Sequence, residues 1–132
     1  MSHLLDVNLL LACAWQSHAD HAKARAWLEK QTTFATCALS QLGFLRVSMS
    51  PGYRAGFADA LAALEDITSR RGAQFLADDL PAAALPAVTS HADTTDAYLV
   101  ALAKAHGLKL STLDRQLCQK PWAKGIAEDP LR

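Results

Sequence analysis

The chain has 132 residues, a length typical of one domain, and we expect a single domain over residues 1–132. Hydrophobic residues make up 51% of it, but 26 residues are alanine, which indicates many helices around a modest core. The 13 basic and 13 acidic residues cancel, which argues against a nonspecific nucleic-acid coat and against a disordered chain of high net charge.

The cysteines and the apolar runs are typical of a protein of a reducing, aqueous compartment. Cys13, Cys37 and Cys118 are odd in number and form no CxxC pair, which argues against a disulfide framework and a zinc knuckle. The longest apolar run, Leu9 to Trp15, is too short to span a bilayer, and no secretory signal is visible. We therefore expect a cytoplasmic protein without membrane contact.

Hydrophobic patterning predicts short strands that alternate with helices. In chain order we expect a strand at 3–6, helices at 8–14 and 20–30, a strand at 34–38, a helix at 40–50, a helix at 57–71, strands at 73–77 and 108–112 with a helix at 96–106 between them, and an edge strand near Ile126. We expect Ser40 to cap the helix at 40–50, with Leu42, Leu45 and Met49 facing the core. This alternation predicts an α/β fold with a short, mostly parallel central sheet flanked by helices.

Acidic side chains occur where the predicted elements meet one edge of that sheet. Asp6 ends the first strand, and Asp114 closely follows the strand at 108–112. Asp96 and Gln41 lie at the starts of helices, which begin at the same edge because connecting helices run antiparallel to the strands. Ligands of parallel sheets bind at this carboxyl edge, so we expect three carboxylates and one amide to meet there.

Singly, each of these residues has a structural explanation, as a helix cap, a helix-dipole partner or a turn residue. Together they would repel one another, and some would be forced to hold protons. A hard divalent cation removes that cost, and Mg²⁺ prefers all-oxygen sites with few protein ligands. The pattern therefore favours a metal site.

Four segments resemble the successive motifs of one known family. They are Leu4-Leu5-Asp6-Val7-Asn8-Leu9-Leu10, Ala38-Leu39-Ser40-Gln41-Leu42-Gly43-Phe44-Leu45-Arg46-Val47, Thr95-Asp96-Ala97-Tyr98-Leu99 and Ser111-Thr112-Leu113-Asp114-Arg115. In order and separation they look like the PIN domain, and more narrowly like VapC-type toxins of bacterial type II toxin–antitoxin modules. No single motif is specific, but the ordered set covers most of the chain.

The resemblance implies a ribonuclease that depends on Mg²⁺ or Mn²⁺ and hydrolyses RNA phosphodiesters with a metal-activated water. Asp6, Asp96 and Asp114 would be the catalytic, metal-holding acids, with Asn8 and Thr112 as polar supports. Gln41 stands where many relatives carry a glutamate, and it adds no negative charge. The resemblance also implies a VapB-like antitoxin that holds the enzyme inactive, and a homodimer.

Further residues are candidates around this site. Asp93 lies one helical turn before Asp96 and would compensate in part for Gln41, although a helix-start role explains it as well. The segment 104–124 carries five basic residues and one acid, and it surrounds Asp114, so it would guide an RNA backbone. Arg115 in that segment, and Arg46, are the candidate phosphate contacts.

Two other functions stay open from the sequence. Gln41 is compatible with a PIN fold that binds RNA or a partner protein with weak or no catalysis. A phosphoacceptor receiver or an aspartyl phosphatase also places aspartate at strand ends, but Asp6-Val7-Asn8 lacks the second aspartate of a phosphatase loop.

Overall fold

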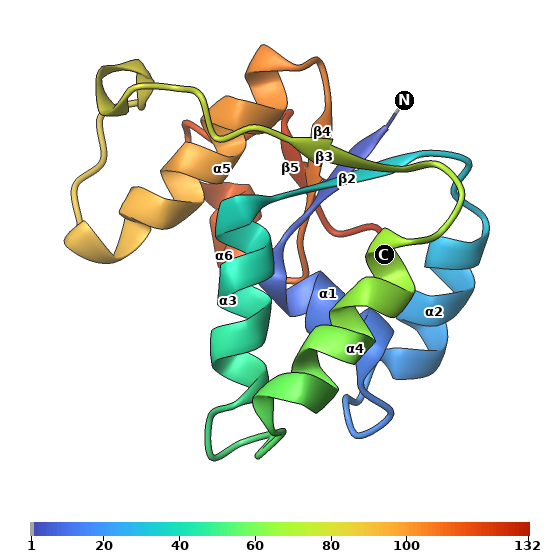
Figure 1. The fold of residues 1–132 in the computed structure, drawn as a ribbon. Coiled ribbons are helices and arrows are strands. Elements are labelled where there is room, and N and C mark those ends of the chain that lie inside the picture. The colour runs from blue at the N-terminus through green and yellow to red at the C-terminus, as the bar shows by residue number, and fades with distance from the viewer. Residues whose placement is uncertain (1) are drawn as a thin grey trace.

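The computed structural model describes residues 2–132, and strands and helices alternate along it (Figure 1). The strands are β1 (His3–Leu5), β2 (Phe34–Cys37), β3 (Ala73–Leu76), β4 (Lys109–Ser111) and β5 (Ala127–Glu128). The helices are α1 (Val7–Ala14), α2 (His21–Glu29), α3 (Ala38–Ser48), α4 (Phe57–Thr68), α5 (Thr94–Ala105) and α6 (Arg115–Gln119), with 3-10 turns at Ala82–Ala84 and His91–Asp93.

The five strands form one sheet in the order β3-β2-β1-β4-β5, and every neighbouring pair is parallel. β1 is the central strand, with Leu4 opposite Ala35 of β2 and Leu110 of β4. The predicted parallel α/β fold is confirmed, and the edge strand near Ile126 begins one residue later. Because all strands point the same way, their carboxyl ends share one edge.

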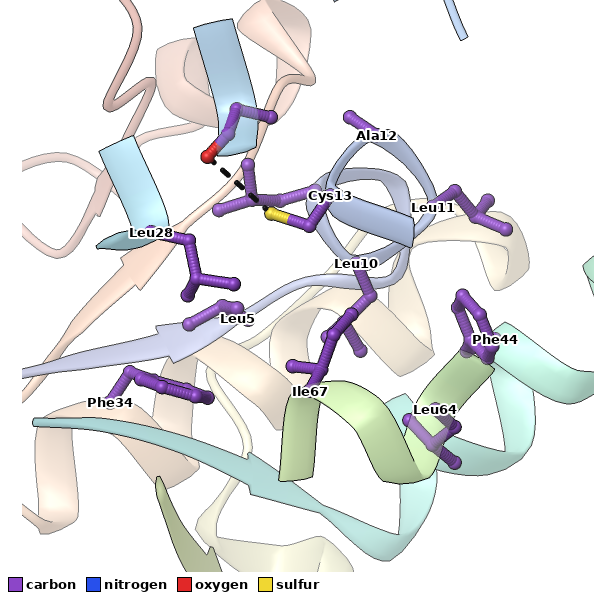
Figure 2. Packing of buried hydrophobic residues seen from close by; sticks show 12 residues of the cluster. Leu5, Leu10, Leu11, Ala12, Cys13, Leu28, Phe34, Phe44, Leu64 and Ile67 are labelled. Carbon is purple, nitrogen blue, oxygen red and sulfur yellow. Dashed lines mark hydrogen bonds between the residues drawn. The ribbon is translucent and has the colours of Figure 1, made fainter. Parts of the chain in front are cut away.

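A hydrophobic core lies on each face of the sheet. Successive side chains of a strand point to opposite faces, so Leu5 and Phe34 pack with α1, α2 and α4, whereas Leu4 and Ala35 pack with α5 and α6. Figure 2 shows the first core, in which Leu5, Leu28 and Phe34 lie against one another. The helices therefore cover both faces and leave the strand ends accessible.

Helix α3 differs from its prediction in where it starts and in the face that it buries. Cys37 is the N-cap, and Ser40 lies inside the helix, where its hydroxyl accepts a hydrogen bond from the Cys37 N–H. Leu42 is 63% exposed and Met49 is 48% exposed, so the prediction that these two face the core was wrong, whereas Leu45 is partly buried against the first core as predicted. The buried face consists of Ser40, Gly43, Phe44 and Ser48. Its small side chains bring α3 close to α1.

One such contact sets the distance between α1 and α3. A Cβ added at Gly43 would lie 2.5 Å from Cγ2 of Val7, which is shorter than real Cβ contacts. Val7 is the first residue of α1 and directly follows Asp6. The absence of a side chain at Gly43 therefore lets α3 approach the end of β1.

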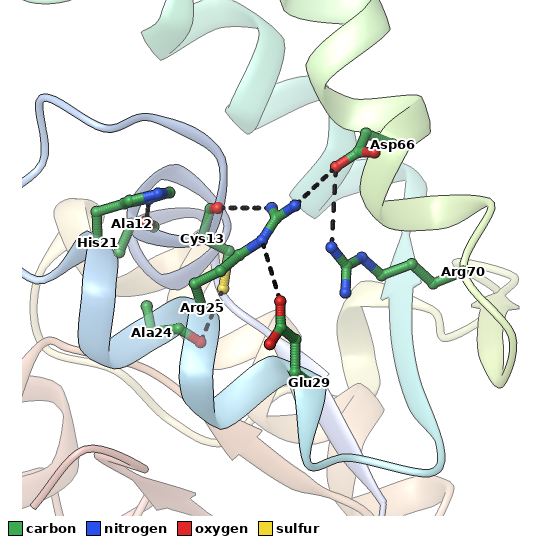
Figure 3. Close-up of polar contacts among 8 residues, drawn as sticks. All are labelled: Ala12, Cys13, His21, Ala24, Arg25, Glu29, Asp66 and Arg70. Atoms are coloured by element: carbon green, nitrogen blue, oxygen red, sulfur yellow. Dashed lines mark hydrogen bonds and ion pairs between the residues drawn. The ribbon is translucent and has the colours of Figure 1, made fainter.

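An arginine-centred cluster joins three helices on one face (Figure 3). Arg25 of α2 donates through Nη1 to the backbone oxygen of Cys13 at 3.0 Å and through Nη2 to Oδ2 of Asp66 at 3.1 Å. Arg70 faces the same carboxylate at 4.0 Å, and Glu29 faces Arg25 at 3.9 Å. The cluster links the C-terminal ends of α1 and α4 to the middle of α2.

Cys13, Cys37 and Cys118 are all free. Burial raises the pKa of the Cys13 thiol to about 12. Within residues 2–132, none of the helices has both the length and the apolar character needed to cross a membrane.

Candidate active site

Asp6 lies where β1 ends and α1 begins, at the carboxyl edge of the sheet. It is only 6% exposed. Its Oδ1 accepts a hydrogen bond from the Val7 N–H at 2.8 Å, which caps α1, and its Oδ2 accepts one from the Thr112 hydroxyl at 2.7 Å. Burial raises the pKa of Asp6, while these two hydrogen bonds lower it because they favour the charged form.

Thr112 connects the end of β1 to the segment that follows β4. Its hydroxyl donates to Asp6 and accepts from Nδ2 of Asn8 and from the N–H of Asp114, each at 3.1 Å. The Leu113 N–H donates to Oδ1 of Asn8 at 3.0 Å, which holds the amide in place. Asn8 and Thr112 thus form one polar network around Asp6.

Two further carboxylates reach the same place from other elements. Asp114 is the N-cap of α6, where its Oδ1 accepts from the Leu117 N–H at 3.1 Å, and its side chain is exposed. Asp96 lies in the first turn of α5 and is half-buried. Asp6, Asp96 and Asp114 all line one cavity of about 750 Å³. The structure therefore brings together three acids that are far apart in the sequence.

The acids influence one another electrostatically. Burial is the main cause that raises the pKa of Asp96 from 3.8 to about 6, and the negative charges of Asp6 and Asp114 come next. Asp93 also raises this pKa, whereas Lys120 lowers it. A half-buried carboxyl among other carboxylates is costly to ionise, and a bound cation would remove that cost.

Apart from Arg46, the residues of the other wall of the cavity were not predicted as site residues. This wall consists of residues of α1, α3 and α5 and of the 3-10 turn before α5, namely Val7, Leu11, Leu39, Leu42, Gly43, Arg46, Val47, Ala92, Thr95 and Leu99. The sequence pattern predicts that Leu42 faces the core, and for this reason it does not predict an apolar cavity wall on α3. Arg46 brings an exposed guanidinium to this cavity, and its contact to a phosphate stays a prediction.

Four predicted residues do not line this cavity, and one of them is Thr112, which contacts the site through Asp6. Gln41 donates through Nε2 to the Thr36 hydroxyl at 2.9 Å. Asp93 pairs with Lys120, with 3.3 Å between Oδ2 and Nζ. Arg115 lines a separate cavity with Cys118 and Asp129.

Comparison with known families identifies the fold. The family model described as the PIN domain matches residues 3–123, which are most of the chain. The chain belongs to the PIN-domain family. This membership argues against the receiver and aspartyl-phosphatase alternatives.

Curated relatives of this PIN domain are VapC ribonucleases. Ribonuclease VapC38 of Mycobacterium tuberculosis is 41% identical over 118 residues, which cover 84% of each chain. Ribonuclease VapC39 of the same species is 35% identical over 138 aligned positions, which cover 97% of this chain and 99% of that protein. The chain is thus a VapC-type PIN domain.

Solved structures share the fold of this PIN domain at low sequence identity. VapC20 of Mycobacterium tuberculosis, described as a sarcin-ricin loop cleaving toxin, superposes with a TM-score of 0.66 at 17% identity and covers 87% of this chain and 92% of its own. A chain of FitAB bound to an IR36 DNA fragment superposes with a TM-score of 0.67 at 16% identity, covering 98% and 96%. These likenesses support the fold alone.

The donors in the cavity of this PIN domain fit a hard divalent cation in kind. The three carboxylates offer oxygen only, which Mg²⁺ and Mn²⁺ prefer, and burial together with their mutual repulsion raises the pKa of Asp96. In the part of the chain that the structure describes, no three His, Cys, Asp or Glu side chains are gathered tightly enough to hold an ion as they stand. An ion would therefore draw the acids together or bind with water between them.

Proposed function

We propose that this VapC-type PIN domain is a metal-dependent endoribonuclease and the toxin of a toxin–antitoxin module. The observation that carries the proposal is the convergence of Asp6, Asp96 and Asp114 on one cavity. Its curated relatives at 35–41% identity are named ribonucleases, which supports the activity. The high pKa of Asp96 supports a site that is completed by a cation.

Asp6, Asp96 and Asp114 would hold one or two Mg²⁺ or Mn²⁺ ions. When bound, such an ion lowers the pKa of a water molecule and stabilises the charge that develops on the phosphoryl oxygens. Thr112 orients Asp6 through its hydroxyl and favours the ionised form of this carboxyl, against the burial that raises its pKa. Since the nucleophile is water, the 2′-hydroxyl of the RNA takes no part, and cleavage leaves a 5′-phosphate and a 3′-hydroxyl.

The substrate would enter between the acids and α3. Arg46 stands on the α3 wall, where its guanidinium offers a bidentate contact to a backbone phosphate. Leu39 and Leu42 beside it give an apolar surface on which an unstacked base can lie. This combination favours single-stranded RNA, whose bases are accessible.

The same wall would receive the inhibitory partner. We propose that an antitoxin segment binds this wall. One apolar side chain of the segment would pack on Leu42, which is 63% exposed, and one positively charged side chain would contact the acids. A structural neighbour is VapBC2 of Rickettsia felis bound to a promoter DNA fragment, with a TM-score of 0.63 at 15% identity over 98% of both chains. We also propose that the protein works in the cytoplasm as a homodimer.

Cleavage of a fluorogenic single-stranded RNA, titrated with Mn²⁺ or Mg²⁺, tests the nuclease proposal. We expect Asp96→Asn to lower kcat by at least about a hundredfold, because it removes a charge that would hold the ion. Asp59→Asn is the matched control, since Asp59 is an exposed acid on α4 outside the cavity. Equal cleavage by the parent and Asp96→Asn would contradict the catalytic assignment.

Growth of bacteria that express the chain tests the toxin proposal separately. Asp6→Asn is expected to relieve growth arrest at matched protein level while the circular dichroism spectrum stays unchanged. An Asp6→Asn protein that is equally toxic would show that the site is wrong.

A PIN-fold binding module is the second candidate, and Gln41 favours it. The amide bonds to Thr36 and adds no charge to the site. A binding module would retain RNA affinity in the parent and in Asp96→Asn, with no metal-dependent cleavage by either. If the nuclease is merely weakened by the amide, Gln41→Glu should instead tighten Mn²⁺ binding.

A further inference from the structure

A second cavity lies on another face of α5, apart from the acids. It has a volume of about 510 Å³, which is in the range of small-ligand pockets. One wall is α5, one is the segment between β3 and α5, which arches out beside α5 in Figure 1, and one is the turn that follows α6. The lining residues are Leu80, Ala84, Leu85, Pro86, Val100, Ala101, Lys104, Ala105, Trp122 and Ile126. The cavity is therefore apolar, with one lysine at its wall.

Trp122 is the aromatic side chain of this cavity, and the fold uses it less than the other two tryptophans. Trp15 donates its indole N–H to the Ser48 hydroxyl at 3.0 Å, and Trp27 packs edge-on against the His3 ring. Among residues 2–132, Trp122 has no aromatic partner and no acceptor for its indole N–H, which is not fully buried. Part of its ring packs against the second core, and the rest is free to contact a flat ligand.

Lysines without ion-pair partners accompany Trp122. Lys104 lines the cavity with it, Lys124 follows it by two residues, and both are exposed. Neither forms an ion pair within the part of the chain that the structure describes. The Lys120 C=O accepts from the N–H groups of Ala123 and Lys124, at 3.0 and 3.1 Å. This closed turn carries the indole with a lysine on either side of it in the sequence.

Lys120 connects the turn to the active site. Its Nζ lies 3.3 Å from Oδ2 of Asp93, one helical turn before Asp96. Asp96 is in the first turn of α5 and Lys104 is in the last, which places them about 12 Å apart along the helix axis. A strand of RNA with its scissile phosphate at the acids can therefore reach the second cavity with a nucleotide further along the same strand.

We propose that the second cavity is a subsite for one unstacked base of single-stranded RNA. The base lies against the indole of Trp122, and the phosphates beside it contact Lys104 and Lys124. The indole N–H is available to donate to a carbonyl oxygen of the base. Stacking on an aromatic side chain accepts any base, so the subsite adds affinity without selecting a sequence. The subsite rests on the proposed nuclease function, because it binds the same substrate.

The charges around the cavity select RNA as the occupant. Lys104, Lys120 and Lys124 are all positive, and the lining residues include no acid. A nucleotide joins a flat ring to a phosphate, which matches a flat indole beside ammonium groups. A peptide with acidic and aromatic side chains offers similar groups. Its path past Lys120 leads to three carboxylates that repel it, whereas an RNA phosphate would meet the cation that those carboxylates hold.

Binding of an oligouridylate dodecamer in EDTA tests the subsite apart from cleavage, with fluorescence anisotropy as the readout. Trp122→Ala should raise the Kd about tenfold, and Trp122→Phe should stay within about threefold of the parent because a phenyl ring still stacks. Inorganic polyphosphate is the matched ligand, since it has the charges and no bases. The alanine variant should lose affinity for the RNA and not for the polyphosphate, and circular dichroism checks its fold.

The salt dependence of the same binding tests the lysines. Lys104→Gln and Lys124→Gln should each lower the slope of log Kd against log salt concentration by about 0.7, which is the value for one phosphate contact to a single strand. Lys23→Gln is the control, because Lys23 is exposed on α2, which packs against the first core. Its slope should equal that of the parent.

Cleavage of RNA of two lengths tests whether the subsite serves the acids. The ratio of kcat/KM for the dodecamer to kcat/KM for a tetranucleotide should fall about tenfold in Trp122→Ala, through the KM of the dodecamer. The shorter RNA cannot occupy both cavities, so it gains nothing from the indole. A general loss of structure would lower both values alike and leave the ratio as it is in the parent.

Four outcomes would overturn the subsite: no binding of the oligouridylate by the parent, equal losses of RNA and polyphosphate affinity in Trp122→Ala, a cleavage ratio that does not fall, or binding of an acidic peptide at Trp122 in place of RNA. Metal-dependent cleavage by the parent in any of these cases would leave the nuclease proposal standing. RNA binding that depends on Trp122, with no cleavage, would support the subsite and contradict the nuclease.

Discussion

The hydroxyl of Thr112 donates a hydrogen bond to Oδ2 of Asp6 over 2.7 Å and accepts one from the Asp114 N–H over 3.1 Å. One oxygen atom thus ties the end of β1 to the turn that follows β4. Burial favours the protonated form of Asp6, and the Thr112 bond favours the ionised form that a cation needs. The threonine therefore orients the most buried acid of the site and opposes the effect of burial on its pKa.

Thr112→Val is expected to raise the pKa of Asp6 and to weaken Mn²⁺ binding by about tenfold, because the isosteric side chain cannot donate. Thr112→Ser keeps the hydroxyl and should retain most of the affinity. Isothermal titration with Mn²⁺ measures both, and circular dichroism checks the fold. Equal Mn²⁺ affinity in the valine and serine variants would contradict a role for the hydrogen bond.

Asp96→Asn should stabilise the metal-free protein at neutral pH. The pKa of Asp96 is about 6 in the folded state and 3.8 in the unfolded chain. Between these two pH values the folded state therefore binds more protons than the unfolded state. Stability of the parent therefore falls as the pH rises through this window, and the variant escapes the loss. We expect a gain of about 1–2 kcal/mol at pH 7.5 that vanishes near pH 4, measured by urea unfolding. A gain that is the same at both pH values would show that Asp96 does not cause it.

Divalent cations should stabilise the parent only when the acids are ionised. Below about pH 6 a proton occupies Asp96 and competes with the ion. The rise in Tm with Mg²⁺ or Mn²⁺ should therefore be large at pH 7.5, small at pH 5, and reversed by EDTA. Asp96→Asn should show little rise at either pH. Undiminished stabilisation of the parent at pH 5 would place the ion elsewhere.

Gly43→Ala should destabilise the protein by about 1–2 kcal/mol, although alanine is the better helix former. The added methyl group would lie 2.5 Å from Cγ2 of Val7 and push α3 away from α1. In a Val7→Ala background the same substitution should be neutral or stabilising. Urea unfolding of the four proteins measures the coupling between the two positions, and additive effects would rule out the contact.

Local hydrophobic patterning and the order of the residues were enough to predict the sheet and the meeting of the three acids. The alternation of short strands with helices predicted a parallel sheet, and Leu4 and Leu5 are both apolar because β1 is buried on both faces. In such a sheet every strand ends at one edge, so the positions of Asp6, Asp96 and Asp114 along the chain were enough to expect that they meet. The family resemblance rested on these same segments, and the family comparison confirmed it.

Tertiary packing decided what the pattern left ambiguous. Helix α3 has two faces that could be buried. The face around Gly43 is the buried one, because its small residues allow close contact with α1. Leu42, on the other face, lines the cavity. Asp93 turns to Lys120, a residue of a distant segment, and Gln41 bonds to Thr36. Side-chain partners of this kind depend on distances between elements, and sequence spacing carries no information about those distances.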